Sequence, residues 1–232
     1  MHTEIQSMHL RASQKQLTLH TGVYYTGMDD EAHTFCTVSD SLQHSPSAIW
    51  AYLTPVLDRI KAEVSDVDTI NFYSDGPATQ YRQKGNFYLF NKEMADRNMK
   101  QATWNFHETS HGIGVPDGVG GSLKRTENMS VLHGKDITTA TDFVKTVKTP
   151  DSKIRIFQVT EEDVKSKIIE KLKLQPIPGT MKIHQILSVK RGELWYRDLS
   201  YNSMEVHEHQ GQHLKFFSFW KVIMLYSICS LH

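Results

Sequence analysis

The stretch NFYSDGPATQYRQKGNF (Asn71–Phe87) decides the fold, because it leads the chain out of a β-strand, through a turn and into a helix. The residues Thr69–Tyr73 are strand formers, and Ser74-Asp75-Gly76-Pro77 is turn chemistry. Helix-forming residues follow in the second half of Gly85–Asn98. The stretch therefore predicts one β-α unit with an aspartate where the strand ends.

The stretch WNFHETSHGIGVPDGVGGSLKR (Trp104–Arg125) repeats this order. We expect a strand over Gln101–Ser110, a glycine-rich turn that contains Asp117, and a helix over Ser122–Leu132. Two β-α units in succession predict neighbouring parallel strands with helices packed on them.

An antiparallel hairpin precedes these units. Gln16–Thr26 and Ala32–Asp40 have the alternation of strands, with turn residues between them. Ser45–Val64 then changes to a helical period, with Ser45 as the cap and Pro46 as the first helical residue. The predicted fold class is α/β, a mixed sheet with an antiparallel edge, a parallel part and flanking helices.

After Pro150 a new series of strand and helix patterns begins. A strand over Lys153–Val159, a helix from Glu161 to Leu174, and a hairpin of Met181–Val189 with Glu193–Ser200 predict a small α+β appendage. The expected division is thus a core over residues 1–148, the appendage over 149–200, and an irregular, apolar tail over 201–232.

Composition sets broad limits. Basic and acidic residues balance at 26 each, so the net charge gives no indication of a polyanionic partner. The two cysteines make no disulfide framework, and the polar N-terminus has no signal-peptide pattern, so we expect an intracellular protein. Phe216–Leu231 is almost wholly apolar but shorter than the roughly 20 residues of a spanning helix. A membrane anchor, a docked terminal helix or strand, and a misjoined gene end all remain open, with membrane attachment the least favoured.

Asp75 and Asp117 are the candidate metal ligands. Carboxylates at the carboxyl ends of neighbouring parallel strands face the crevice where open α/β sheets bind ligands. Paired aspartates there suit Mg²⁺ or Mn²⁺, and two such ions can promote in-line displacement at a phosphodiester. The alternative is plain turn chemistry, since both Ser-Asp-Gly-Pro and Asp-Gly are common turn sequences.

Basic residues around the same loops are candidate phosphate contacts: Arg82, Lys84, Lys124 and Arg125. His111 is either a ligand, a phosphate contact or a packing residue. Tyr81 and Trp104 are candidates to stack on bases, although the strand spacing of Trp104 and Phe106 favours the core for Trp104. The run HEHQGQH (His207–His213) lacks a defined zinc spacing and is interpreted as surface.

Three segments together carry a family resemblance: EIQSMH (Glu4–His9), FYSDGPATQYR (Phe72–Arg82) and the glycine-rich stretch Trp104–Arg125. They resemble a group of uncharacterised animal proteins derived from transposable elements, which look like transposases with an RNase H-like, acidic-triad (DDE-type) integrase core. The likeness covers about Glu4–Arg125 and continues more weakly to about Ser200.

The resemblance implies a function and a set of roles. Asp75 would be the second acid of the triad, Asp117 the third, and the cofactor two Mg²⁺ or Mn²⁺ ions. The partner would be DNA and the location the nucleus. The first acid would stand on a central first strand just upstream of Glu4, so we expect it to be missing here; Glu4 and Asp40 are poor replacements.

Three functions follow as hypotheses. The first is a transposase-type nuclease or strand transferase, incomplete in this chain. The second is a non-catalytic nucleic-acid-binding remnant. The third is a structural or membrane-tethered protein in which Phe216–Leu231 is the feature that matters. Oligomerisation is left open.

Overall fold

The computed structural model describes residues 4–10, 15–29, 31–75, 81–107, 114–168, 174, 177, 179–197 and 222–226. The strands are β1 (Glu4–His9), β2 (Gln16–Thr26), β3 (His33–Ser39), β4 (Thr69–Asp75), β5 (Gln101–His107), β6 (Arg155–Gln158), β7 (Gln185–Lys190), β8 (Glu193–Arg197) and β9 (Val222–Tyr226). The helices are α1 (Pro46–Glu63), α2 (Lys84–Asp96), α3 (Val115–Leu132), α4 (Ala140–Val147), α5 (Glu161–Ser166) and the 3₁₀ turn η1 (Thr180–Lys182).

The strands form one mixed sheet in the order β6-β3-β2-β9-β4-β5-β7-β8, and β1 pairs with β2 beside this path. The predicted hairpin is confirmed, since β2 and β3 pair antiparallel. The predicted parallel pair is also confirmed, because β4 and β5 run parallel from Thr69↔Gln101 to Asp75↔His107. The α/β class with an antiparallel part and a parallel part is therefore what the chain forms.

Local sequence explains where the first helix begins. The Ser45 hydroxyl accepts a hydrogen bond from the Ala48 N–H, and Pro46 is the first residue of α1. Pro55 lies inside the helix, where it has no N–H to give. The helix buries Trp50, whose indole N–H donates to the Asn86 Oδ1 of α2 at 2.8 Å. That bond ties the first two helices together on one face of the sheet.

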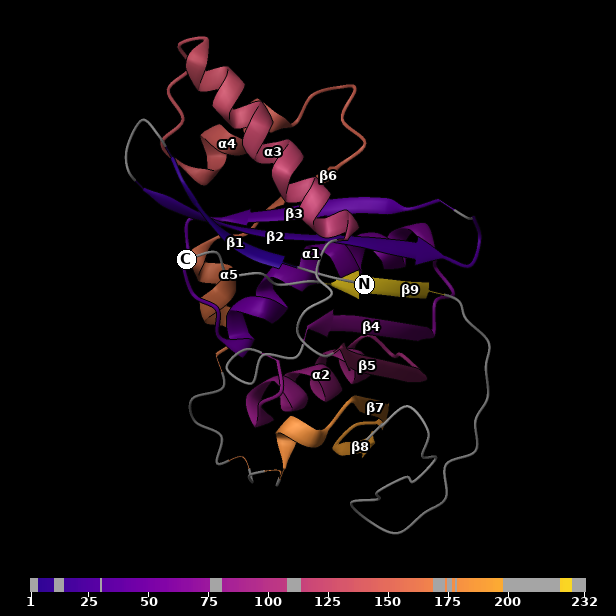
Figure 1. Ribbon diagram of the computed structural model, residues 1–232. Helices are drawn as coiled ribbons and strands as arrows, with labels where there is room; N and C mark the ends of the chain where they lie inside the picture. Colours follow the sequence, from indigo (N-terminus) through magenta and orange to yellow (C-terminus); the bar gives the residue numbers. More distant parts are fainter. Residues whose placement is uncertain are drawn as a thin grey trace.

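Two apolar clusters lie on opposite faces of the sheet. The larger cluster joins α1, α2 and α5 to β4 and β5 and contains Phe72, Phe90 and Trp104. The smaller one packs α3 and α4 on β2 and β3 and contains Leu19, Val38, Leu123 and Phe143. Figure 1 shows α3 crossing over the β1–β2–β3 part of the sheet. The result is a three-layer helix–sheet–helix arrangement.

The described strands of residues 149–200 belong to the common sheet and not to a sheet of their own. β6 pairs parallel with β3 at one edge, whereas β7 pairs antiparallel with β5 toward the other edge. Val164 and Ile186 from this segment belong to the larger apolar cluster. The expected appendage instead extends both edges of the common sheet, because its apolar residues are buried against the same core. Its helix is also shorter than expected and ends at Ser166.

The C-terminal tail supplies a strand inside the sheet, which differs from the irregular tail that we expected. β9 pairs antiparallel with β2 and parallel with β4, so it lies between them (Figure 1). Of the three alternatives for the tail, the docked strand is the one observed for Val222–Tyr226. None of the helices in the described ranges has both the length and the apolar character that crossing a bilayer requires.

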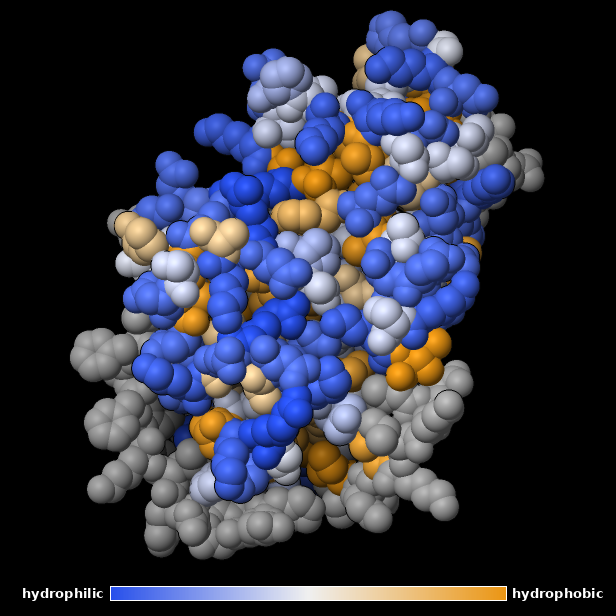
Figure 2. All heavy atoms as spheres, turned by 180° about the vertical axis from the view of Figure 1, so that it is seen from behind, coloured by the Kyte–Doolittle hydropathy of each residue, from blue (hydrophilic) through white to orange (hydrophobic). Residues whose placement is uncertain are grey.

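The surface has the mixed character that the composition predicts. On the face seen in Figure 2, hydrophilic residues cover most of the area and apolar residues gather in small groups. Mean hydropathy is −0.45, and the formal net charge is zero. Any charged ligand must therefore be recognised by local groups of side chains.

Candidate functional site

The candidate site lies where β4 and β5 end. Asp75 is the last residue of β4, so the strand runs two residues further than predicted and Asp75 is not part of the loop. Its register partner is His107, the last residue of β5, which sequence reasoning missed. Neighbouring strands lie about 4.8 Å apart, so these two backbone positions are side by side at the carboxyl edge. Their side chains lie outside the described part of the structure.

A hydrogen bond from the core fixes the end of β4. The Trp104 indole N–H donates to the Ser74 Oγ at 2.9 Å, one residue before Asp75. Trp104 is fully buried, and its ring lies 5.4 Å from those of Phe72 and Tyr81. Trp104 is thus a core residue, as its spacing with Phe106 predicted, and Tyr81, a candidate for base stacking, is also buried in the core. Neither is available to stack on a base.

A row of polar side chains crosses β4, β5 and β7. Thr103 Oγ1 donates to Asn71 Oδ1 at 2.6 Å, and Asn105 Nδ2 donates to the Phe72 carbonyl at 2.9 Å. Gln185 Nε2 continues the row by donating to Asn105 Oδ1 at 2.6 Å. The alternation of polar and apolar residues in these strands is the sequence signal for this row. The row joins β4, β5 and β7 across the middle of the strands.

Asp117 has a structural task. It lies in the first turn of α3, which begins at Val115 and not after Asp117 as predicted. Its carboxylate accepts a hydrogen bond from the Gly114 N–H at 3.2 Å, while the Asp117 N–H donates to the Gly114 carbonyl at 3.1 Å. A carboxylate here also complements the positive end of the helix dipole. Gly118, Gly120 and Gly121, which we expected in a turn, are therefore helix residues.

Convergence of Asp75 and Asp117 on one cation stays a prediction. His111 and the run His207–His213 lie outside the described residues. Among the side chains that are described, no three from His, Cys, Asp and Glu gather as a metal site requires. Asp117 brings one carboxylate that already accepts a helix N–H, so the described donor set does not fit a two-metal centre.

Two of the predicted phosphate contacts have partners inside the protein. Arg82 is only 6% exposed; its Nη1 donates to the Met181 carbonyl at 2.8 Å, and its guanidinium lies 5.5 Å from the centre of the Phe106 ring. The Arg82 side chain holds the turn η1 against the sheet. To reach a phosphate it would have to break these interactions and turn out to the surface. Lys84 is exposed, and its Nζ donates to the Leu174 carbonyl at 3.1 Å.

Lys124 and Arg125 lie on the outer side of α3. The helix buries Val119, Leu123 and Glu127, so the intervening positions face away from the sheet. Lys124 is half-exposed and Arg125 is exposed. Of the four predicted basic residues, these two and Lys84 are accessible to a phosphate.

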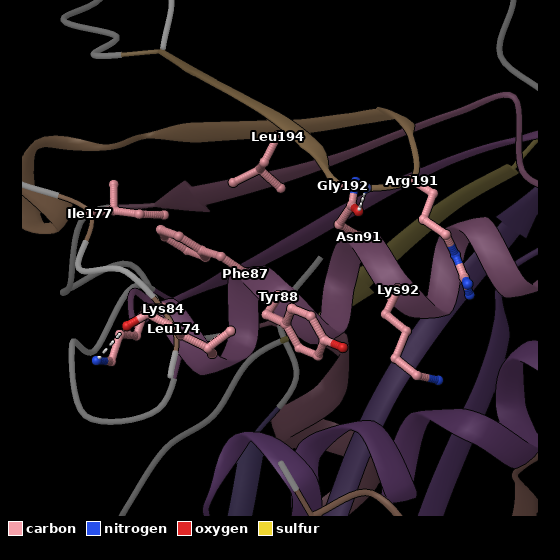
Figure 3. A pocket seen from close by; sticks show the side chains of 10 residues that line it. All are labelled: Lys84, Phe87, Tyr88, Asn91, Lys92, Leu174, Ile177, Arg191, Gly192 and Leu194. Carbon is pink, nitrogen blue, oxygen red and sulfur yellow. Dashed lines mark hydrogen bonds between the residues drawn. The ribbon is translucent and has the colours of Figure 1, made fainter. Parts of the chain in front are cut away.

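A cavity of about 310 Å³ lies between α2 and the β7–β8 hairpin (Figure 3). Its apolar lining comes from Phe87, Tyr88 and Leu194, with further residues from the segment before η1. Lys84 lies near one end of the cavity and Lys92 and Arg191 near the other (Figure 3).

Asn91, Lys92 and Arg191 on the rim of the cavity already have partners within the protein. Asn91 fixes the hairpin by donating to the Lys190 and Glu193 carbonyls and accepting from the Gly192 N–H. Lys92 and Arg191 share the Asp96 carboxylate, which leaves their end of the cavity with an excess of positive charge. Aromatic faces next to cations are suited to a flat, apolar group that carries an anion.

Comparison with known proteins gives a family but no function. The chain belongs to the family described as Domain of unknown function (DUF8701), which matches residues 1–200. No curated protein and no solved structure matches the chain.

Proposed function

We propose that the chain is a DNA-binding core of the RNase H-like, transposase or integrase type that acts in the nucleus. The observation that carries the proposal is the middle of the sheet. β3, β2, β9, β4 and β5 are adjacent in that order, and Asp75 ends the strand that follows the central one. The resemblance implies a central strand in the core, and here a central strand lies directly beside the strand that Asp75 ends, which supports the proposal.

The central position supports the proposal further. The strand in that position runs antiparallel to β2 and parallel to β4, as the first strand of the resembled core would. Here β9 takes it, and Val222–Tyr226 contains no acidic residue. Among the described residues, the strand segment that lies between β2 and β4 supplies no acid, which favours DNA binding over strand cleavage.

DNA binding would use exposed or half-exposed cations at two places. Lys124 and Arg125 project from the outer side of α3, whose first turn follows the carboxyl edge of β5. Lys84 begins α2 after the same edge of β4 and borders the aromatic cavity. Phosphates would contact the cations, and an unpaired base would rest against Tyr88.

A metal-dependent cleavage activity is the second candidate, and Asp75 is the observation that favours it. Asp75 occupies the carboxyl edge in register with His107, where a carboxylate meets ligands in open α/β sheets. The described residues do not complete a metal site, so we derive no catalytic step from them. The two candidates differ in one measurable respect, which is whether bound DNA is cut.

The test is fluorescence anisotropy with a labelled 20-base-pair duplex over a range of salt concentrations. We expect salt-sensitive binding, and Lys124→Ala with Arg125→Ala should reduce the slope of log K against log salt by about 2. The matched control is Lys100→Ala with Lys153→Ala, two exposed cations just before β5 and β6 at the opposite, amino edge of the sheet. An equal loss in both double variants, or no binding at low salt, contradicts the proposal.

The same duplex distinguishes binding from cleavage. Incubation with Mg²⁺ or Mn²⁺ should leave it intact if the chain only binds. Cleavage that disappears in Asp75→Asn would instead establish the second candidate. Cleavage that persists in Asp75→Asn points to a contaminating nuclease.

A further inference from the structure

We propose that the slot between β2 and β4 is a strand-acceptor site, which binds an extended apolar peptide of five residues and is filled in cis by Val222–Tyr226. This inference goes beyond the proposed function and does not depend on it, because it rests on strand pairing alone. The mode is β-augmentation inside a sheet: main-chain hydrogen bonds supply affinity and side chains supply specificity.

The slot has two edges that need a partner. β2 offers Gly22–Thr26 in antiparallel register, and β4 offers Asn71–Tyr73 in parallel register. Backbone N–H and C=O groups inside a sheet cost free energy when they are left unpaired. Some strand must therefore occupy this place whenever the two halves of the sheet are together.

The slot is closed at one end. β1 and β9 lie end to end along the same edge of β2, since Tyr226 pairs with Gly22 and Glu4 pairs with Thr21. No residue of β2 is skipped between them. A strand that continued past Tyr226 would run into β1, so β1 fixes where the occupant ends.

The occupant is attached differently from the other strands. Residues 198–221, which number 24, separate β9 from β8, whereas β7 and β8 are joined through Arg191 and Gly192 alone. β9 also pairs with only three of the seven residues of β4. Tethering a segment to its site generally supplies an effective concentration on the order of millimolar, so a free peptide at that concentration can compete.

The occupant also lies outside the region that defines the family. The family match covers residues 1–200, and β9 begins at Val222. Within the described residues up to 197, every other strand is already paired elsewhere and none enters the slot. The acceptor edges thus belong to the shared domain, whereas the strand that fills them comes from a segment beyond it.

The sequence of the tail suits the slot. Val222–Tyr226 reads Val-Ile-Met-Leu-Tyr, which is rich in strand-forming residues and has no charge, glycine or proline. A charged residue, Lys221, precedes it and a serine follows it. The ligand class is therefore an uncharged, β-forming pentapeptide that runs antiparallel to β2.

The first experiment locates the occupant in the full-length protein by disulfide trapping. Val23→Cys and Leu225→Cys are register partners, and Cys229→Ser removes a competing thiol, while native Cys36 is fully buried. Mild oxidation should link the pair within a monomer at least tenfold faster than it links Val23→Cys with Val222→Cys, whose register partner is Thr26. Equal rates for the two pairs overturn the register. Disulfides that form only between chains overturn filling in cis and identify a second copy as the occupant.

The second experiment asks whether the slot accepts a strand in trans. Full-length protein with Val23→Cys and Cys229→Ser is mixed with a millimolar peptide of residues 221–227 that carries cysteine in place of Leu225 and two added lysines for solubility. Mass spectrometry should show a disulfide adduct that forms several-fold faster than with a shuffled peptide that has cysteine at the same position. An equal rate for both peptides, or no adduct with either, overturns the acceptor site.

Discussion

The buried imidazole of His20 makes the stability of this fold depend on pH. His20 lies in β2, is completely buried, and faces the rings of Phe35 and Tyr52 at 6.0 and 5.9 Å between ring centres. Burial disfavours the charged imidazolium, and it lowers the pKa of His20 from 6.5 to about 3. Folding therefore excludes a proton that the unfolded chain binds.

The sign and size follow from this shift. Between pH 6.5 and 3 the unfolded state binds more protons than the folded state, so the free energy of unfolding falls as the pH falls through this window. The contribution is intact above pH 6.5. Each pH unit below 6.5 costs about 1.4 kcal/mol, so at pH 5.0 the loss is about 2 kcal/mol. That is a large share of the roughly 5–15 kcal/mol of a typical domain.

The assay is urea unfolding followed by tryptophan fluorescence at pH 7.5 and pH 5.0. We expect the wild-type protein to lose about 2 kcal/mol between these conditions and His20→Leu to lose little. Hydrogen bonds lower the carboxyl pKa values of Asp29, Asp96 and Asp142 from 3.8 in the folded protein. These groups therefore stay ionised between pH 7.5 and pH 5.0 and do not contribute to the difference. His44 has a pKa lowered by burial and contributes with the same sign, and His44→Gln measures its share. An equal loss in wild type and His20→Leu would refute the reasoning.

Three other predictions concern side chains that the structure gives a clear role. Asp117→Ala should lower the thermal midpoint by an amount equivalent to about 1 kcal/mol, the usual value of a helix cap, and an unchanged melting curve contradicts that role. Glu93 is 2% exposed and forms ion pairs with Arg97 and Lys167. Glu93→Gln should lower the free energy of unfolding, measured with urea, by roughly 3 kcal/mol. The matched control is Glu161→Gln, because Glu161 is exposed and pairs with Lys165; it should lower the free energy of unfolding by less than about 0.5 kcal/mol. Similar losses in the two variants would argue against burial as the cause.

The helices and strands of the middle of the chain could be predicted because their local signals agree with their packing. Ser45 and Pro46 mark the start of α1, and the strand residues Phe72 and Trp104 point into the core that the apolar pattern implied. The parallel pairing of β4 with β5 followed from two β-α units in succession. The start of α3 was misjudged because three glycines weigh against a helix locally, whereas Val119 and Leu123 are buried against the sheet and override that preference.

The candidate site was only partly accessible to such reasoning. Asp75 was expected at the carboxyl edge of a parallel strand, and strand direction alone brings it to that edge. Arg82 was taken as a phosphate contact because a basic residue in a loop is usually exposed. What the sequence does not display is the aromatic face of Phe106 and the carbonyl of Met181, 99 residues away, which together hold the guanidinium inside.

The place of the tail could not be predicted from local pattern at all. The residues Val222–Tyr226 indicate a strand, but the partner of a strand is decided by which edges remain open elsewhere in the sheet. β1 covers Gln16–Thr21 of β2 and leaves the next five residues, and β4 has a free side facing them. The tail enters because that vacancy matches its length and direction. By the same argument, any uncharged strand of five residues that can reach this vacancy competes for it, so the integrity of the central sheet is a binding equilibrium between the shared domain and the segment beyond it.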